Sequence, residues 1–180
     1  MIDFANKKIL ITGATGGIGE ELVKKFTSLN GNVLATGTKN EKLDVLKKNF
    51  PSINVLKFDI SDHSKIEEFI DNVTLELGGL DILINNAGVI RRGKITESSD
   101  EDLEVSMMVN IEAPFRLCRA SIPLLTQRGG GAIVNIASCW GLYPGPSHPI
   151  YVMTKAAIAS LTQCLGRDHA GENIRVNAVC

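Results

Sequence analysis

Six short apolar runs, each separated from the next by a segment of helical character, dominate this sequence of 180 residues. The runs lie at 8–12, 32–36, 53–58, 80–84, 131–137 and 174–179. Strands that alternate with helices predict a parallel sheet, and strands that are apolar along nearly their whole length predict that both sheet faces are covered. We therefore expect an α/β fold with a doubly wound parallel sheet, strand order 3-2-1-4-5-6, and helices on both faces.

The helical segments have less sharply marked limits than the strands. Helices are expected to end near residues 29 and 49, and a third runs to Leu77 with Asp62 as its N-cap. A long helix is expected over about 100–127, where Pro114 and Pro123 predict a kink or tighter limits. A Gly- and Pro-rich loop at 139–149 then leads to the helix that carries Tyr151.

The first apolar run leads directly into a glycine-rich turn at 12–19, which a helix follows. Glycines allow positive φ and close approach of the backbone to a ligand. The N-terminus of a helix offers free N–H groups and partial positive charge to an anion. This context predicts a Rossmann-type site for the pyrophosphate of a dinucleotide. The expected contacts are Gly13, Thr15, Gly16, Gly17, Ile18 and Gly19.

The end of the second strand bears on which nicotinamide cofactor is bound. A carboxylate there would bind the ribose 2′-hydroxyl of NAD, and a basic residue would accept the 2′-phosphate of NADP. The sequence has Thr38 and Lys39 at this place and no carboxylate before Glu41. This favours NADP, with Thr38 and Lys39 as contacts, and leaves NAD possible. The alternative is that Lys39 is only a solvated surface lysine.

Two further strand ends carry candidate cofactor contacts. Asp59 and Ile60 follow the third run, where an adenine edge would lie, although Asp59 could equally cap the next turn. Asn86, Ala87 and Gly88 follow the fourth run beside the expected nicotinamide ribose. Their small side chains permit close approach, but such residues are also ordinary in loops.

Tyr151 and Lys155 stand four residues apart on an expected helix, so their side chains share one face. A neighbouring cation favours the phenolate and lowers the pKa of a tyrosine, which makes it a usable proton donor or acceptor near neutral pH. Ser138 lies 13 positions before Tyr151. Together with a nicotinamide site, this pair predicts hydride chemistry at a carbonyl or alcohol carbon.

The turn at 12–19, the Asn-Asn-Ala-Gly run at 85–88, and Asn110, Ser138 and the Tyr-x-x-x-Lys at 151–155 resemble the short-chain dehydrogenase/reductase family in order and spacing. The resemblance implies that Tyr151 is the general acid/base and that Ser138 orients the substrate carbonyl. It implies that Lys155 lowers the pKa of Tyr151 and that both contact the nicotinamide ribose. It also implies that Asn110 holds a water molecule of a proton relay. Members of the family commonly form homodimers or homotetramers, which we expect here as well.

The chain also departs from the family pattern. Members usually continue past the sixth strand with a substrate-covering segment and a last strand, so we expect residues 1–180 to form a single catalytic domain that lacks both. Many members that use NADP carry a basic residue where this sequence has Gly16.

Several substrates fit the resemblance. The first half is similar to 3-oxoacyl-acyl-carrier-protein reductases, which implies a small-molecule or carrier-bound carbonyl substrate. Arg91 and Arg92 resemble a pair in sugar-acid dehydrogenases, so a sugar acid or polyol is the alternative, and solvated surface charges are an equal reading. Trp140 is expected to shape the substrate cleft with Ser138 and Tyr151. A nucleotide-binding module without turnover is the alternative from another class.

Bulk composition excludes several other classes. The formal net charge is −1, so the sequence shows no electrostatic footprint for nucleic acid or an anionic membrane. The four cysteines have neither Cys-x-x-Cys nor Cys/His spacing, which predicts free thiols and no metal site. No apolar run has the length of a membrane span or a signal-peptide core, which predicts a cytoplasmic protein.

Overall fold

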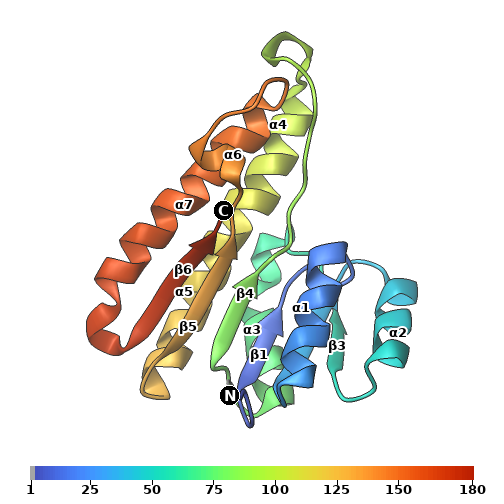
Figure 1. Cartoon of the computed structure of the whole chain (residues 1–180), viewed down its shortest axis with the longest axis vertical. Coiled ribbons are helices and arrows are strands. Elements are labelled where there is room, and N and C mark those ends of the chain that lie inside the picture. Colours follow the sequence, from blue (N-terminus) through green and yellow to red (C-terminus); the bar gives the residue numbers. More distant parts are fainter. Residues whose placement is uncertain (1–2) are drawn as a thin grey trace.

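A computed structural model describes residues 3–180 as helices packed on one six-stranded sheet (Figure 1). The strand order is β3-β2-β1-β4-β5-β6, and every neighbouring pair is parallel. The strands are β1 (Lys8–Ile11), β2 (Asn32–Gly37), β3 (Asn54–Lys57), β4 (Ile82–Asn85), β5 (Gly131–Ile136) and β6 (Ile174–Val179). The predicted fold class and strand order are therefore confirmed, and the strand limits differ from the prediction by at most two residues.

Seven α-helices connect and cover the strands between residues 3 and 180. They are α1 (Gly17–Ser28), α2 (Asn40–Asn49), α3 (Ile66–Leu77), α4 (Asp100–Met107), α5 (Ala113–Gln127), α6 (Cys139–Leu142) and α7 (Pro149–Asp168). Short 3-10 turns lie at His63–Lys65, Ile95–Glu97 and Ala170–Glu172. Within this described part of the chain, no helix combines the length and the apolar character needed to cross a membrane.

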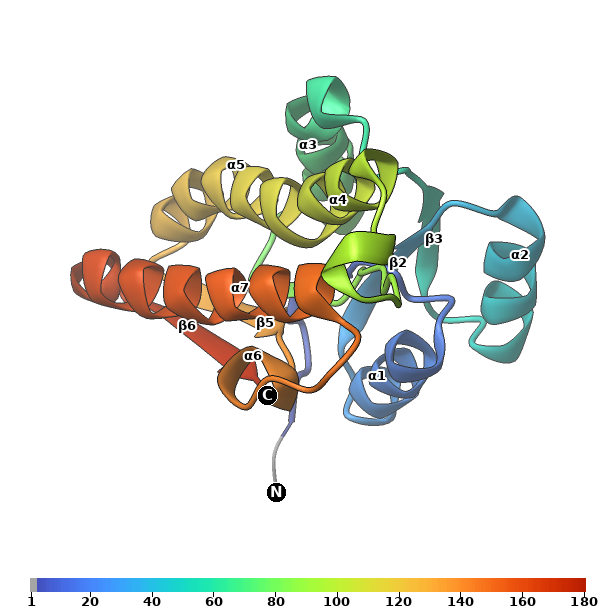
Figure 2. The same ribbon diagram turned by 90° about the horizontal axis from the view of Figure 1, so that it is seen from above.

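Alternate residues of the central strands point into two separate cores, as the period of a strand requires. Leu10 of β1 packs in a core with residues of α3 and α5, and Leu165 of α7 packs against the same core. Ile9 and Ile11 face the opposite way, toward α1 and α2. Figure 2 shows this layering, with α3, α5 and α7 on one side of the sheet and α1 on the other. The covered faces explain why the strands are apolar throughout.

The long helix expected over about 100–127 is interrupted. A π-helical turn, Met108–Glu112, joins α4 to α5, and we call it the π-turn. Pro114 lies in the first turn of α5 and has no N–H to bond to the carbonyl of Asn110 four residues earlier. Pro123 lies inside α5, which continues to Gln127. The prediction that the prolines disturb a single regular helix is confirmed at Pro114.

Two local predictions are wrong. Asp62 does not cap the next helix with its side chain, because its carboxylate accepts from Ser64 Oγ at 2.7 Å and pairs with Lys65 at 3.1 Å. A 3-10 turn intervenes, and α3 begins only at Ile66. The loop expected at 139–149 also contains the short helix α6, whose first N–H groups are capped by Ser138 Oγ through the backbone N–H of Trp140 at 3.2 Å.

Candidate active site

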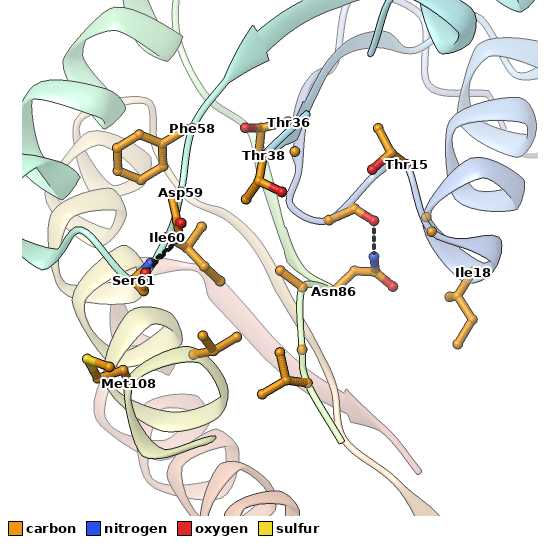
Figure 3. A pocket seen from close by; sticks show the side chains of 18 of the residues that line it. Thr15, Ile18, Thr36, Thr38, Phe58, Asp59, Ile60, Ser61, Asn86 and Met108 are labelled. Carbon is orange, nitrogen blue, oxygen red and sulfur yellow. Dashed lines mark hydrogen bonds between the residues drawn. The ribbon is translucent and has the colours of Figure 1, made fainter. Parts of the chain in front are cut away.

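A cavity of about 570 Å³ opens at the carboxyl ends of β1 to β4 (Figure 3). The turn from β1 to α1 forms one wall, and the segments after β2, β3 and β4 form others. The end of α4 and the start of the π-turn close it through Val105, Met108 and Val109. In open parallel sheets, ligands bind beyond the carboxyl ends of the strands where the strand order reverses. Here the order reverses between β1 and β4, so we call this cavity the nucleotide cleft.

Some glycines of the β1–α1 turn are required by close packing, and one is not. Gly13 has φ +61°, and a Cβ there would lie 2.7 Å from Ala87 Cα. A Cβ on Gly19 would lie 2.6 Å from Ala14 Cα. Gly17, by contrast, has open space where its Cβ would be, although it lines the cleft. Packing within the protein thus explains Gly13 and Gly19, whereas Gly17 is free of such contacts on the cleft side.

The start of α1 presents unpaired donors to the cleft. The first N–H groups of a helix have no partner within the helix, and the N-cap here is Gly16, which has no side chain to cap them. Thr36 of β2 adds a hydroxyl that is buried in the cleft wall and has no hydrogen-bond partner among residues 3–180. These groups suit a ligand with phosphate and hydroxyl oxygens.

Hydrogen bonds fix the β1–α1 turn to the end of β4. Thr12 Oγ1 accepts from the backbone N–H groups of Asn86 and Ala87, both at 3.1 Å. The Asn86 amide donates to the carbonyls of Thr12 at 2.9 Å and Gly13 at 3.0 Å, and Figure 3 draws such a bond beside Asn86. The side chain of Asn86 therefore shapes the turn as well as lining the cleft.

Lys155 and Tyr151 lie together on α7, as their spacing predicts. Lys155 Nζ lies 5.6 Å from the centre of the Tyr151 ring and donates to the carbonyl of Ile136 at 2.7 Å. Lys155 is only 5% exposed, and this burial lowers the pKa of its ammonium group. Trp140, two residues after Ser138, places its ring edge-on to Tyr151, with 6.4 Å between ring centres.

The side chain of Asn110, in the π-turn, makes three hydrogen bonds to two residues. Its side-chain oxygen accepts from the Val89 N–H at 2.8 Å, and its amide nitrogen donates to the Val89 carbonyl at 2.9 Å. The same nitrogen donates to Thr154 Oγ1 at 3.1 Å. Asn110 thus ties the segment after β4 to α7, next to Lys155.

Gly88 connects the two parts of the site. It lines the nucleotide cleft, and a Cβ built on it would lie 3.3 Å from Asn110 Oδ1 and 3.5 Å from Lys155 Nζ. A ligand in the cleft that reached Gly88 would therefore lie within a side chain's length of the buried ammonium group. A dinucleotide-sized cleft that ends beside a buried lysine and a half-buried tyrosine suits proton and hydride transfer at one place.

A family model described as short chain dehydrogenase matches residues 7–180. This chain belongs to the short-chain dehydrogenase family. An oxidoreductase of Thermotoga maritima without an assigned substrate is 38% identical over 99% of this chain and 72% of its own length. The 3-oxoacyl-[acyl-carrier-protein] reductase FabG of the same organism is 32% identical over 96% of this chain and 72% of its own length.

A relative named for a different reaction and a solved structure are also similar to this chain. The meso-2,3-butanediol dehydrogenase of Serratia marcescens is also 32% identical, over 98% of this chain and 71% of its own length. A solved short-chain dehydrogenase from Streptomyces avermitilis superimposes with a TM-score of 0.91 at 30% identity. That match covers 96% of this chain and 64% of the solved one. Proteins of the short-chain dehydrogenase family bind NAD or NADP.

Most residues predicted to bind the cofactor line the cleft of this short-chain dehydrogenase. They are Gly13, Thr15, Gly16, Gly17, Ile18, Gly19, Thr38, Asp59, Ile60, Asn86, Ala87 and Gly88. Lys39, Tyr151 and Lys155 were also predicted as contacts but are not part of the lining. Lys39 is exposed and sits at the N-cap of α2, one residue beyond the cleft edge at Thr38.

Asp59 caps the following turn, which is one of the two roles that the sequence left open for it. Its Oδ1 accepts from the backbone N–H of Ser61 at 3.0 Å and from Ser61 Oγ at 2.7 Å, so Asp59 does cap the following turn. It also lines the cleft, where Figure 3 shows it beside Ile60 and Ser61. The capping role and a ligand contact through the other carboxylate oxygen are therefore compatible.

Sequence reasoning missed part of the cleft wall. The missed residues are Thr36, Gly37, Phe58, Ser61, Val89, Val105, Met108 and Val109. Five of them lie within two residues of predicted contacts and follow from the rule that strand ends line the site. The three from 105–109 carry no sequence signal, because only the packing of α4 and the π-turn brings them to the cleft.

The remaining predictions have mixed outcomes. Arg91 Nε donates to Asp102 at 2.9 Å, so this guanidinium is already paired with a carboxylate of α4. The four cysteines are free thiols, and Cys118 alone is buried. Burial raises the pKa of Cys118 to about 12, which makes it an inert packing residue.

Proposed function

We propose that this short-chain dehydrogenase transfers a hydride between NADP or NAD and a carbonyl or secondary alcohol carbon. The observation that carries the proposal is the position of Lys155. Its ammonium group lies 5.6 Å from the Tyr151 ring and beside Gly88, which lines the nucleotide cleft. A buried lysine next to a tyrosine suits proton transfer at a reacting carbonyl.

The residues of the cleft suit a nicotinamide dinucleotide. Gly17 leaves open space at the uncapped start of α1, which fits the close approach of a pyrophosphate. The unpaired hydroxyl of Thr36 offers one hydrogen bond inside the wall. When bound, the cofactor would supply or receive the hydride. The residues of this chain would transfer the proton and stabilise the charge that develops on the substrate oxygen.

Tyr151 is the proposed acid/base. In the reducing direction its phenol donates a proton to the substrate oxygen, and in the oxidising direction the phenolate removes that proton. The ammonium group of Lys155, 5.6 Å from the centre of the Tyr151 ring, is placed to stabilise the phenolate form. Ser138 Oγ accepts from the Trp140 N–H, which leaves its own hydrogen to donate to the substrate oxygen as negative charge develops there.

Asn110 is the proposed anchor of a water that returns protons from solvent to Lys155. Its side-chain amide is already engaged with Val89 and Thr154. The backbone carbonyl of Asn110 receives no α-helical hydrogen bond from residue 114, because that residue is proline. This carbonyl is therefore the acceptor that we propose for the water.

We propose NADP as the preferred cofactor, with Thr38 at the cleft edge and Lys39 just outside it. The absence of a carboxylate before Glu41 supports this preference. Since Lys39 is exposed, its side chain can swing to a 2′-phosphate. The test is the ratio of kcat/KM for NADPH to that for NADH in wild type and in Lys39→Ala. An unchanged ratio would leave Lys39 without this role.

The preferred substrate in this proposal is a 3-oxoacyl group on a carrier or a small thioester, with a polyol or sugar acid as the alternative. The relatives do not separate the two, since a carrier-linked reductase and a diol dehydrogenase are both 32% identical. The pairing of Arg91 with Asp102 weakens the sugar-acid alternative, because it removes one of the two arginines offered to a carboxylate. Trp140 beside Tyr151 is the proposed wall of the substrate cleft.

A homodimer or homotetramer remains part of the proposal. Large apolar side chains on α4, α5 and α7 are partly exposed, as a helical interface requires. They include Leu103, Phe115 and Met153. Light scattering after size exclusion measures the mass in solution, and a monomer would contradict this part.

The decisive experiment compares Tyr151→Phe with Tyr143→Phe. Tyr143 is the other tyrosine of the chain and is 78% exposed, so it is a matched control. Oxidation of NADPH with a panel of 3-oxoacyl thioesters and diketones should fall by about a hundredfold or more in Tyr151→Phe and stay unchanged in the control. Binding of NADPH, followed by its fluorescence, should persist in both variants. A wild-type protein that binds NADPH but turns over no substrate would instead be a nucleotide-binding module.

A further inference from the structure

His63 reaches across the nucleotide cleft wall from one lining segment to another. It lies two residues after Ser61, in the 3-10 turn His63–Lys65, and its side chain is only 15% exposed. Its Nε2 lies 3.0 Å from the carbonyl oxygen of Met108 in the π-turn. A carbonyl only accepts, so Nε2 carries the proton and donates. The side chains of both Ser61 and Met108 line the cleft.

The Met108 carbonyl is an unusual acceptor. It already receives the backbone N–H of Ala113, five residues later, which is the hydrogen bond that defines the π-turn. His63 adds a second donor to the same oxygen from outside the helix. The wider turn is therefore held from within by Ala113 and from the neighbouring wall by His63.

The other ring nitrogen of His63 faces a carboxylate, and the two form an ion pair when this nitrogen carries a proton as well. Nδ1 lies 3.3 Å from a carboxylate oxygen of Glu112, the last residue of the π-turn. Arg116 of α5 lies 3.4 Å from the same oxygen, so the carboxylate is shared between the two. On the turn that carries His63, Asp62 and Lys65 pair with each other. His63 thus contacts the beginning and the end of the π-turn at once.

We propose that His63 is a positioning residue, which fixes the π-turn against the segment 58–61 and so sets the width of the nucleotide cleft. Val105, Met108 and Val109 form the wall that it holds, and Asn110 follows directly in the same turn. This inference rests on the proposed function, because it assumes that a dinucleotide occupies the cleft.

The other histidine–glutamate pair of the chain provides a matched control. His169 Nδ1 lies 3.1 Å from Glu172, three residues later, in a turn between α7 and β6. Neither residue lines the nucleotide cleft. A general effect of removing a paired histidine would therefore appear at His169, whereas an effect on nucleotide binding would not.

The test compares His63→Asn, His63→Gln and His169→Asn. The glutamine amide can place an N–H where Nε2 was, while the shorter asparagine cannot reach the Met108 carbonyl. The Kd for NADPH, measured by fluorescence titration far below the unfolding temperature, should rise about five- to tenfold in His63→Asn, as loss of one buried hydrogen bond implies. It should stay within about twofold of wild type in His63→Gln and His169→Asn. KM for NADPH should follow Kd, with little change in kcat.

Two results would overturn the inference. One is a His63→Asn variant that binds NADPH as tightly as wild type, even if it unfolds more easily, which is the signature of a purely structural residue. The other is a glutamine variant as weak as the asparagine variant. Should His63→Asn not fold, Glu112→Ala removes the contact at Nδ1 without touching the lining, and unchanged affinity there would also overturn the proposal. A wild-type protein that fails to bind NADPH would instead refute the proposed function.

Discussion

Lys155 carries an ammonium group into surroundings that disfavour its charge. Its ammonium group is 5% exposed and has the Ile136 carbonyl as its near acceptor. Burial of this kind disfavours the charged form, and it lowers the pKa of Lys155 from the ordinary 10.5. The same burial keeps the positive charge close to Tyr151, 5.6 Å from the centre of its ring.

The lowered pKa of Lys155 predicts how stability depends on pH. Between the lowered pKa and 10.5, the unfolded chain binds more protons than the folded one, so the free energy of unfolding rises with pH. Lys155→Met lacks this contribution. The difference in unfolding free energy, wild type minus variant, should therefore be constant below the folded-state pKa and increase above it until about pH 10.5.

Urea unfolding of both proteins from pH 7 to pH 10 measures this difference. Each unit by which the pKa is lowered corresponds to about 1.4 kcal/mol. Lys24→Met is the control, because the Lys24 side chain is 62% exposed and pairs only with Glu21 on the surface. A difference that stays flat across the whole range for Lys155→Met would show that the folded state does not disfavour the charged lysine.

At the scale of elements, the β1–α1 turn combines two requirements in one short segment. Gly13 and Gly19 are needed because backbone atoms of the turn and of the β4 end occupy the space of a side chain. Gly17 has no such neighbour and faces the nucleotide cleft. Folding and ligand binding should therefore be separable by substitution within this turn.

We predict opposite outcomes for Gly19→Ala and Gly17→Ala. The added methyl in Gly19→Ala meets the Gly13 carbonyl and Ala14, so the unfolding free energy should fall by about 1–3 kcal/mol. In Gly17→Ala the unfolding free energy should be unchanged or up to about 1 kcal/mol higher, since alanine favours the helix. Its Kd for NADPH should nevertheless rise about tenfold or more, because the methyl blocks the approach of the pyrophosphate.

Chemical denaturation and NADPH titration of the two variants distinguish these effects. Gly171→Ala is the matched control, since Gly171 also has open space where a Cβ would be, lies in the turn Ala170–Glu172 and does not line the cleft. If Gly17→Ala bound NADPH as tightly as wild type, the start of α1 would not be the pyrophosphate site.

The same turn shows what could be predicted from the sequence. The alternation of apolar runs and helices fixes which strand ends meet at one edge, so Thr38, Asp59 and Asn86 are predicted at the cleft from their place after a strand, and Gly13 from the glycine-rich turn. Val105 and Met108 were not, because their place depends on how α4 and the π-turn pack over that edge. The helix α6 was missed for a different reason: its residues lie in a Gly- and Pro-rich stretch, and its single turn begins at the Ser138 cap.

At the scale of the whole molecule, the sheet order places the site at the ends of the most deeply buried strands. β1 and β4 lie at the centre, with strands on both sides, and their apolar residues are nearly all fully buried. β3 and β6 lie at the two edges of the described sheet, and β6 alternates between buried or half-buried and exposed positions. The turn after β1 and the segment after β4 therefore extend from strands with hydrogen-bonded neighbours on both sides, while Thr38 and Asp59 lie nearer one edge.

This arrangement predicts a gradient in native-state hydrogen exchange. Amides of Leu10 and Ile11 in β1, and of Leu83 and Ile84 in β4, should exchange only through global unfolding, with a full dependence on denaturant. Amides of β3 and β6 should exchange earlier, through local opening that depends little on denaturant, because each edge strand is paired on one side only. Exchange followed by NMR across low concentrations of guanidinium measures both classes.

Saturating NADPH should slow exchange in the 13–19 turn and at 58–61, whereas Gly129 and Gly130 at the other end of the sheet should change only through global stability. Equal protection of β6 and β1 would mean that the sheet opens as one unit, and the edge strands would then share the stability that we assign to its centre.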